Sequence, residues 1–163
     1  MGPSRRDIPE TKPMKTLVLG LGNTILSDDS AGCRVAMALK ERLNMPDVDV
    51  LEAGIAGLSF LDMITGYNRV IIIDAIQTEK GIPGQIYRLG PEILAETRHT
   101  GTPHDVNLAT ALELGKKLKL KLPREITIFA IEVEDVTTFR EDCTPAVEKT
   151  IPKCVQMVIR ELH

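Results

Sequence analysis

The stretch Thr16–Arg34, which reads TLVLGLGNTILSDDSAGCR, constrains the fold more than any other part of this chain. Its apolar start, Leu17–Leu19, is typical of a strand that is buried on both faces. Two glycines then predict a turn, and a helical pattern of apolar residues follows the acidic pair Asp28 and Asp29. This order of strand, glycine turn, acidic pair and helix indicates an α/β fold, in which residues beyond the carboxyl end of a strand line the ligand crevice.

Further strands and helices alternate along the rest of the chain. Apolar runs predict strands at 48–52, 69–75, 85–89 and 125–133, and helical patterns predict helices at 58–64, from about 104, and from 145 onward. The run RVIIIDA at 69–75 is the most apolar and should lie at the centre of the sheet. Only residues 76–84 join it to the next strand, which is too short for a crossover helix, so 85–89 should be an antiparallel edge strand. We therefore predict a three-layer α/β/α sandwich around a mostly parallel, five-stranded sheet.

Length and composition suit a single domain without a nucleic-acid partner. Of the 163 residues, 1–13 are polar and proline-rich and are expected to form a disordered leader of native or vector origin, and 14–163 are expected to form one domain. The net charge of −3 and the aromatic content of 3% predict neither a basic stripe nor a base-stacking surface. No apolar run approaches the roughly 18 residues of a membrane span, so membrane insertion is not expected.

The cysteines favour a reducing compartment. There are 3 of them, and they lack CxxC spacing, so they are expected to fill the core instead of forming disulfides. Their predicted places are a helix, a helix start and an apolar stripe, which disfavours a cysteine nucleophile. We expect a cytoplasmic protein that is a monomer.

The sequence GLGN at 20–23 invites comparison with a dinucleotide-binding turn. The GxGxxG pattern fails, because Ile25 occupies the position of the third glycine. The turn is also too long for a pyrophosphate to meet the N-terminus of the following helix. Binding of an NAD-type cofactor is therefore disfavoured.

Polar side chains from three segments could meet in the predicted crevice. Asp74 ends the most apolar strand, where an isolated buried carboxylate would cost several kcal/mol, so it should face the crevice or meet a cation or backbone donors. Either Asp28 or Asp29 could instead be the N-cap of the following helix or lie in its first turn, where the dipole favours an acid, which would explain one of the two without any function. His104 is expected in the first turn of a helix, where the dipole favours the neutral imidazole that binds metals, although a lone histidine is more often structural.

Asp29, Asp74 and His104 together form an open, partial set of ligands for a divalent transition metal. Two carboxylates and one imidazole leave coordination positions for substrate or water. The second nearby histidine, His99, is expected in a loop. The sequence has no HExxH helix, GxSxG elbow or P-loop that would indicate a different chemistry.

The chain resembles the hydrogenase maturation endopeptidases, which process nickel-iron hydrogenase large subunits. The resemblance covers about residues 14–160, and its motifs occur in the family's order and at similar spacings: LVLGLGNTILSDDSAG, EAGIAGLSFLD, RVIIIDAI, PHDVNL and CTPAVEKTI. The metal-contacting residues of the family fall on Asp29, Asp74 and His104. The resemblance also implies that the substrate is contacted by the loop of Gly54, Ile55, Ala56 and Gly57.

This resemblance implies an aspartyl-type endopeptidase that removes a C-terminal extension from the large-subunit precursor after nickel has been inserted. Nickel would then belong to the substrate and be recognised by Asp29, Asp74 and His104, and the enzyme alone could be metal-free. A rival from a different class is a non-catalytic nickel-sensing or nickel-delivery module that keeps the same three ligands. The sequence does not separate the two, because no dedicated nucleophile is visible.

Overall fold

The computed structural model describes residues 14–54, 57–92 and 103–163, without the side chains of 57–59 and 103–109. Its elements follow the predicted order, with small shifts at their ends: β1 (Thr16–Leu21), the short 3-10 helix η1 (Ser27–Ser30), α1 (Ala31–Arg42), β2 (Val48–Ala53), α2 (Gly57–Ile64), β3 (Arg69–Ile76), β4 (Ile86–Leu89), α4 (Pro103–Lys117), β5 (Glu125–Glu132) and α5 (Pro145–Leu162). Within these described ranges, none of the helices combines the length and the apolar character of a membrane span.

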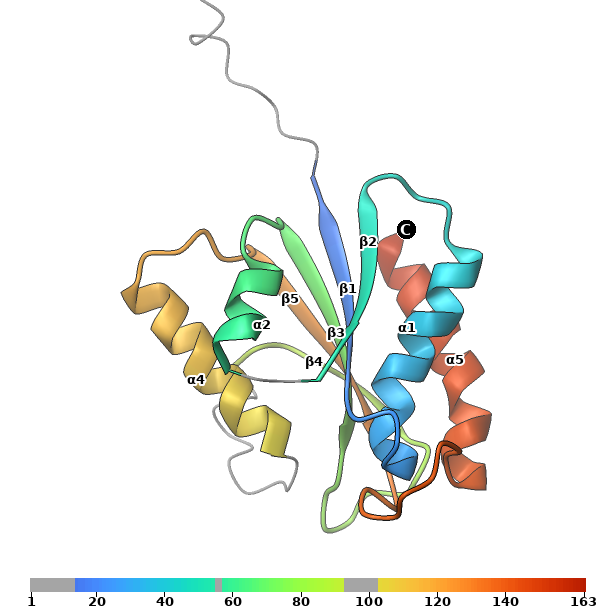
Figure 1. Cartoon of the computed structure of the whole chain (residues 1–163). Helices are drawn as coiled ribbons and strands as arrows, with labels where there is room; N and C mark the ends of the chain where they lie inside the picture. Colours follow the sequence, from blue (N-terminus) through green and yellow to red (C-terminus); the bar gives the residue numbers. More distant parts are fainter. Residues whose placement is uncertain (1–13, 55–56, 93–102) are drawn as a thin grey trace, which may run out of the picture.

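The five strands form one sheet in the order β2-β1-β3-β5-β4 (Figure 1). β1 pairs in parallel with β2 and β3, and β3 pairs in parallel with β5. β4 pairs with β5 in antiparallel orientation and lies at the edge. The predicted sheet, its central apolar strand and its antiparallel edge strand are therefore confirmed.

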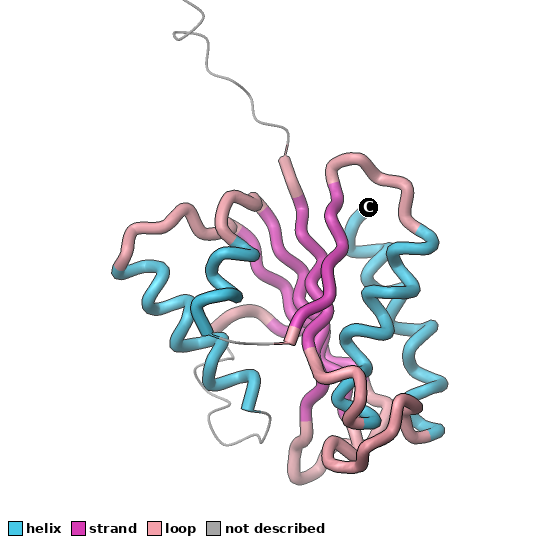
Figure 2. Tube along the Cα trace, in the orientation of Figure 1, coloured by secondary structure: helices cyan, strands magenta, loops and turns pink. Residues whose placement is uncertain are grey.

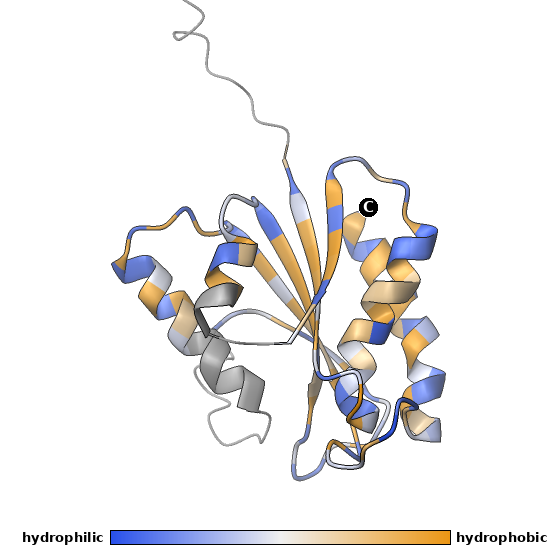
Figure 3. Ribbon diagram, in the orientation of Figure 1, coloured by the Kyte–Doolittle hydropathy of each residue, from blue (hydrophilic) through white to orange (hydrophobic). Residues whose placement is uncertain are grey.

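Helices cover both faces of the sheet, which gives three layers (Figures 1 and 2). Side chains alternate along each strand, so β3 supplies both cores. Its Ile71 and Ile73 pack with α1 and α5, whereas Val70 and Ile72 pack with α2 and α4. Figure 3 shows the middle layer as predominantly hydrophobic, with hydrophilic residues on the outer sides of the helices.

The backbone of helix α1 packs directly on the backbone of the sheet, because glycines occupy the points of contact. A Cβ atom on Gly32 would lie 2.2 Å from the carbonyl oxygen of Ile73 and 2.6 Å from that of Leu21. A Cβ atom on Gly20 would lie 2.3 Å from the carbonyl oxygen of Gly32. These distances leave no room for a side chain, so the two glycines set how closely the start of α1 approaches β1 and β3.

We expect Gly32→Ala to lower the free energy of unfolding by about 2 kcal/mol, because the added methyl group must push the helix away from two backbone carbonyls. Urea denaturation followed by circular dichroism measures this loss. Gly54→Ala is the matched control, since a Cβ atom there meets nothing within 4 Å. Equal stability of the two variants would contradict the backbone contact.

Candidate active site

The sheet changes its winding direction between β1 and β3. The helix that follows β1 covers one face, and the helix that precedes β3 covers the other. In an open α/β sheet, ligands bind in the crevice beyond the carboxyl ends of the strands at such a switch point. Gly20 pairs with Ile73, so the ends of β1 and β3 lie level with each other, and Asp29 and Asp74 come from these two segments. The chain therefore places two predicted site residues at its switch point.

Asp29 is 6% exposed and belongs to η1, the short helix after the glycine turn. The backbone N–H of Asn23 donates to its Oδ2 at 2.9 Å. The turn depends on Gly22, which has φ +144° and whose Cβ would lie 1.9 Å from the carbonyl oxygen of Asp29. Glycine thus lets η1 fold back against the end of β1, and the Asn23 backbone holds the Asp29 carboxylate beside that strand end.

Asp74 is 2% exposed and lies near the carboxyl end of β3. It alternates with Ile73 and shares the face of Val70 and Ile72, so it points toward the layer of α2 and α4. Its Oδ1 accepts a hydrogen bond from the N–H of Ala75 at 2.8 Å. A backbone donor is one of the partners predicted for this acid, and the structure shows one in the Ala75 N–H.

Helix α4 begins at Pro103, so His104 occupies its first turn, as predicted. This helix packs beside α2 on the sheet face to which Asp74 points. The side chain of His104 lies outside the described part of the structure, as do His99, Ile55 and Ala56. Among the described side chains, no group of three or more His, Cys, Asp or Glu is arranged to hold a metal ion. The set of Asp29, Asp74 and His104 therefore stays a prediction.

Neither acid of the pair is the N-cap residue of the following helix, but both lie in the first turn of η1, where the helix dipole favours acids. Helix α1 begins at Ala31, after η1, and its N-cap residue Ser30 makes no side-chain cap hydrogen bond. Asp28 and Asp29 lie inside η1, two residues and one residue before the N-cap position of α1. Asp28 nevertheless has a structural role, with partners far along the chain.

Asp28 is completely buried and accepts four hydrogen bonds from the segment after β5. The N–H groups of Glu134 and Asp135 each donate to its Oδ2 at 3.0 Å. Thr144 donates to it through both its N–H, at 2.6 Å, and its hydroxyl, at 2.8 Å. Thr144 is the N-cap residue of α5, as predicted, but its hydroxyl binds Asp28 and does not cap the helix. Asp28 thus ties the loop that carries Asp29 to the loop between β5 and α5.

Glu132 is a buried carboxylate that the sequence analysis missed. It ends β5, is 2% exposed, and lies on the same sheet face as Asp74. Its Oε2 accepts from the N–H of Thr78 at 2.8 Å, and its Oε1 accepts from the hydroxyls of Thr78 and, at 3.1 Å, Tyr87. Burial and the hydrogen bond to Glu132 raise the pKa of Tyr87. A Cβ atom on Gly81 would clash with this carboxylate, so the loop after β3 folds directly over it.

The cysteines are all free and buried, which confirms their predicted place in the core. Burial raises the pKa of Cys33 to about 11 and that of Cys154 to about 12. Burial also raises the pKa of Cys143. At neutral pH these thiols are protonated, and a protonated thiol is a poor nucleophile.

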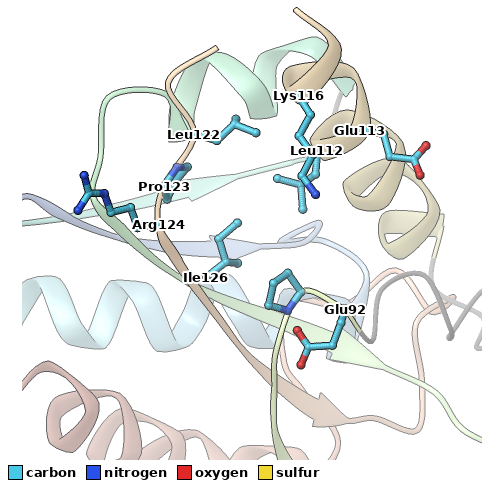
Figure 4. Close-up of a pocket in the computed structure, with 9 residues that line it drawn as sticks. Glu92, Leu112, Glu113, Lys116, Leu122, Pro123, Arg124 and Ile126 are labelled. Carbon is cyan, nitrogen blue, oxygen red and sulfur yellow. The ribbon is translucent and has the colours of Figure 1, made fainter. Parts of the chain in front are cut away.

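A cavity of about 390 Å³ lies between α4 and the start of β5 (Figure 4). Neither Asp29 nor Asp74 lines it. Its floor is apolar and includes Leu112, Leu122 and Ile126. Ile126 pairs with Val70, which precedes Asp74 by four residues on β3, or roughly 13 Å of strand. The cavity therefore belongs to the opposite end of the sheet from the candidate active site.

Comparison with known proteins identifies the family. The family model described as hydrogenase maturation protease matches residues 33–161. The hydrogenase 2 maturation protease of Escherichia coli is 32% identical over 152 residues, which cover 92% of each chain. This chain belongs to the hydrogenase maturation protease family.

Solved structures of the family share the fold. The hydrogenase maturating endopeptidase HybD from Escherichia coli matches with a TM-score of 0.82 at 30% identity, over 91% of this chain and 92% of that chain. The [NiFe] hydrogenase maturation protease HybD from Thermococcus kodakarensis matches with a TM-score of 0.73 at 26% identity, over 90% of this chain and 98% of that chain. Membership in the hydrogenase maturation protease family confirms the resemblance seen in the motifs and makes this chain a hydrolase of the peptidase class.

We expect Glu132→Gln to be tolerated and Glu132→Ala to cost about 3 kcal/mol of unfolding free energy. Glutamine can accept from the Thr78 N–H with its oxygen and donate to the Thr78 and Tyr87 hydroxyls, which can both rotate to accept. Alanine removes the acceptor of the Thr78 N–H and hydroxyl, whereas the Tyr87 hydroxyl keeps Gln85 as an acceptor. Urea denaturation of the two variants measures the difference, and a glutamine variant as unstable as the alanine variant would show that the negative charge itself is required.

Proposed function

We propose that this chain is an endopeptidase that removes the C-terminal extension of a nickel-iron hydrogenase large-subunit precursor after nickel insertion. One observation carries the proposal. Asp29 and Asp74 are buried carboxylates from different segments, and they flank the switch point of a sheet in a chain of the maturation protease family. The buried free thiols support the predicted cytoplasmic location.

The carboxylates of Asp29 and Asp74, together with the imidazole of His104, contact nickel that is already seated in the precursor. Backbone N–H groups hold one oxygen of each carboxylate, so both acids are oriented before the substrate arrives. Two carboxylates and one imidazole are a sparse ligand set that should hold free nickel weakly. The set gains affinity when the metal arrives with its own thiolate ligands, because the substrate then completes the coordination.

The chemistry of the described residues favours water as the nucleophile. The thiols of this chain are buried and protonated. A carboxylate at the crevice can act as a general base for water, as the predicted aspartyl-type mechanism requires. In this proposal nickel belongs to the substrate, and contact with it aligns the scissile bond with the carboxylates.

The rival hypothesis of a non-catalytic nickel-sensing or nickel-delivery module has lost support. Its sequence argument was the lack of a visible nucleophile, but the chain belongs to a family of proteases and shares their fold. Incubation with nickel-loaded precursor separates the two functions, because only a protease shortens the precursor by its C-terminal peptide, a loss of mass that mass spectrometry detects.

We expect Asp74→Asn to abolish processing and leave the fold intact. The amide has the size of the carboxylate and keeps an oxygen for the Ala75 N–H, but it lacks the charge that contacts nickel. Circular dichroism checks the fold, and electrophoresis of the precursor checks cleavage. Normal cleavage with a loss of about 1 kcal/mol of stability would mean that Asp74 only binds backbone.

We expect a protease stripped by chelator to cleave nickel-loaded precursor at the normal rate and to leave nickel-free precursor intact. The chelator is removed before mixing, and no metal is added. A resident catalytic metal, such as zinc that activates water, would be lost to the chelator. Activity that returns only after metal is given back to the protease would contradict the proposal that nickel comes with the substrate.

A further inference from the structure

Two large apolar side chains are exposed on adjoining loops near the candidate active site. Phe139 is 79% exposed and Ile25 is 49% exposed. Leu26 forms an isolated parallel bridge with Arg140, and the N–H of Arg140 donates to the carbonyl oxygen of Ile25 at 2.9 Å. Ile25 directly precedes Leu26 and Phe139 directly precedes Arg140, so this bridge holds the two residues on adjoining loops. We call the two side chains the Ile25–Phe139 ridge.

The ridge is joined to the Asp29 carboxylate through Asn23. The side-chain oxygen of Asn23 accepts from the N–H of Ile25 at 3.1 Å, and the N–H of Asn23 donates to Asp29 at 2.9 Å. The two loops that carry the ridge, after β1 and after β5, meet at one end of the sheet (Figure 1). A protein that occupies the crevice at Asp29 must therefore pass close to the ridge.

Hydrogen bonds also fix the backbone of the two loops that carry the ridge. Asp28 accepts hydrogen bonds from both Asp135 and Thr144, and the N–H of Ser27 donates to the carbonyl oxygen of Arg140 at 2.8 Å. An exposed aromatic side chain on a fixed backbone loses little conformational entropy when a partner covers it. Such residues are typical anchors of protein–protein interfaces.

We propose that the Ile25–Phe139 ridge docks against an apolar patch on the folded body of the precursor, whether or not the precursor carries nickel. This inference rests on the proposed function, because it takes the substrate to be a folded protein whose scissile segment reaches Asp29. Docking through the ridge supplies affinity outside the scissile bond. Nickel contact at the carboxylates then decides whether the docked precursor is cleaved.

The test measures binding and cleavage separately. Nickel-free precursor is immobilised, and the dissociation constants of the wild-type protease, Phe139→Ser, Phe139→Leu and Ile25→Ser are measured. Leu118→Ser is the matched control, because Leu118 is 57% exposed and follows α4 at the opposite end of the sheet. Thermal unfolding checks that each variant is folded, and cleavage of nickel-loaded precursor is followed in parallel.

We expect the dissociation constant to rise about tenfold for Phe139→Ser and Ile25→Ser, the loss typical of one buried anchor. Phe139→Leu should keep most of the affinity, and Leu118→Ser all of it. With nickel-loaded precursor, KM should rise in the two serine variants while kcat stays the same, because docking does not change the bond-breaking step.

Unchanged dissociation constants in the serine variants would overturn the inference, and so would a wild-type protease that does not bind nickel-free precursor. Sedimentation of the wild-type protease alone tests whether a second copy of this chain binds the ridge instead. Self-association that Phe139→Ser abolishes would overturn the inference and assign the ridge to that second copy. Failure of the proposed function looks different, since ridge-dependent binding would remain while nickel-loaded precursor stays uncleaved.

Discussion

The buried carboxylate of Asp28 is the interaction on which the rest of the site depends. It accepts hydrogen bonds from the N–H groups of Glu134, Asp135 and Thr144, and Asp28 itself is completely buried. These hydrogen bonds join the loop after β1 to the loop before α5. Asp29 and the ridge stand on the joined loops, so one carboxylate that touches no substrate orients both the proposed nickel contact and the proposed docking surface.

The four buried acids at the carboxyl edge differ in the hydrogen bonds that they accept. Asp28 and Glu132 are satisfied by donors that belong to the scaffold, and each pins a loop to the sheet. Asp29 and Asp74 take a backbone N–H on one oxygen and flank the switch point. In the proposed function Asp29 and Asp74 contact the nickel that the substrate brings, whereas Asp28 and Glu132 hold the surrounding loops in place.

Local patterns in the sequence were sufficient for the fold and for part of the site. Apolar runs located every strand, and the short connection at 76–84 predicted the antiparallel edge strand. Asp74 stood out because an acid at the end of RVIIIDAI needs a partner or a crevice. Glu132 carries the same signal in EITIFAIE, and it was missed because that run was treated only as a strand.

Other features depend on contacts between distant residues. The partners of Asp28 lie 106 to 116 residues further along the chain, so reasoning from neighbours produced a helix cap instead. The Ile25–Phe139 ridge depends on a bridge between Leu26 and Arg140 that neither segment predicts alone. The order of the strands, which creates the switch point between β1 and β3, also comes only from the assembled sheet.

X-ray absorption at the nickel K-edge tests the central claim most directly, because it reports the atoms bound to the metal. Nickel-loaded precursor is measured alone and in complex with chelator-stripped protease, frozen before cleavage. The proposed site predicts additional oxygen and nitrogen ligands on nickel in the complex, and fewer of them when the protease carries Asp74→Asn. An identical nickel coordination shell with and without the protease would contradict recognition of the substrate's nickel by Asp29, Asp74 and His104.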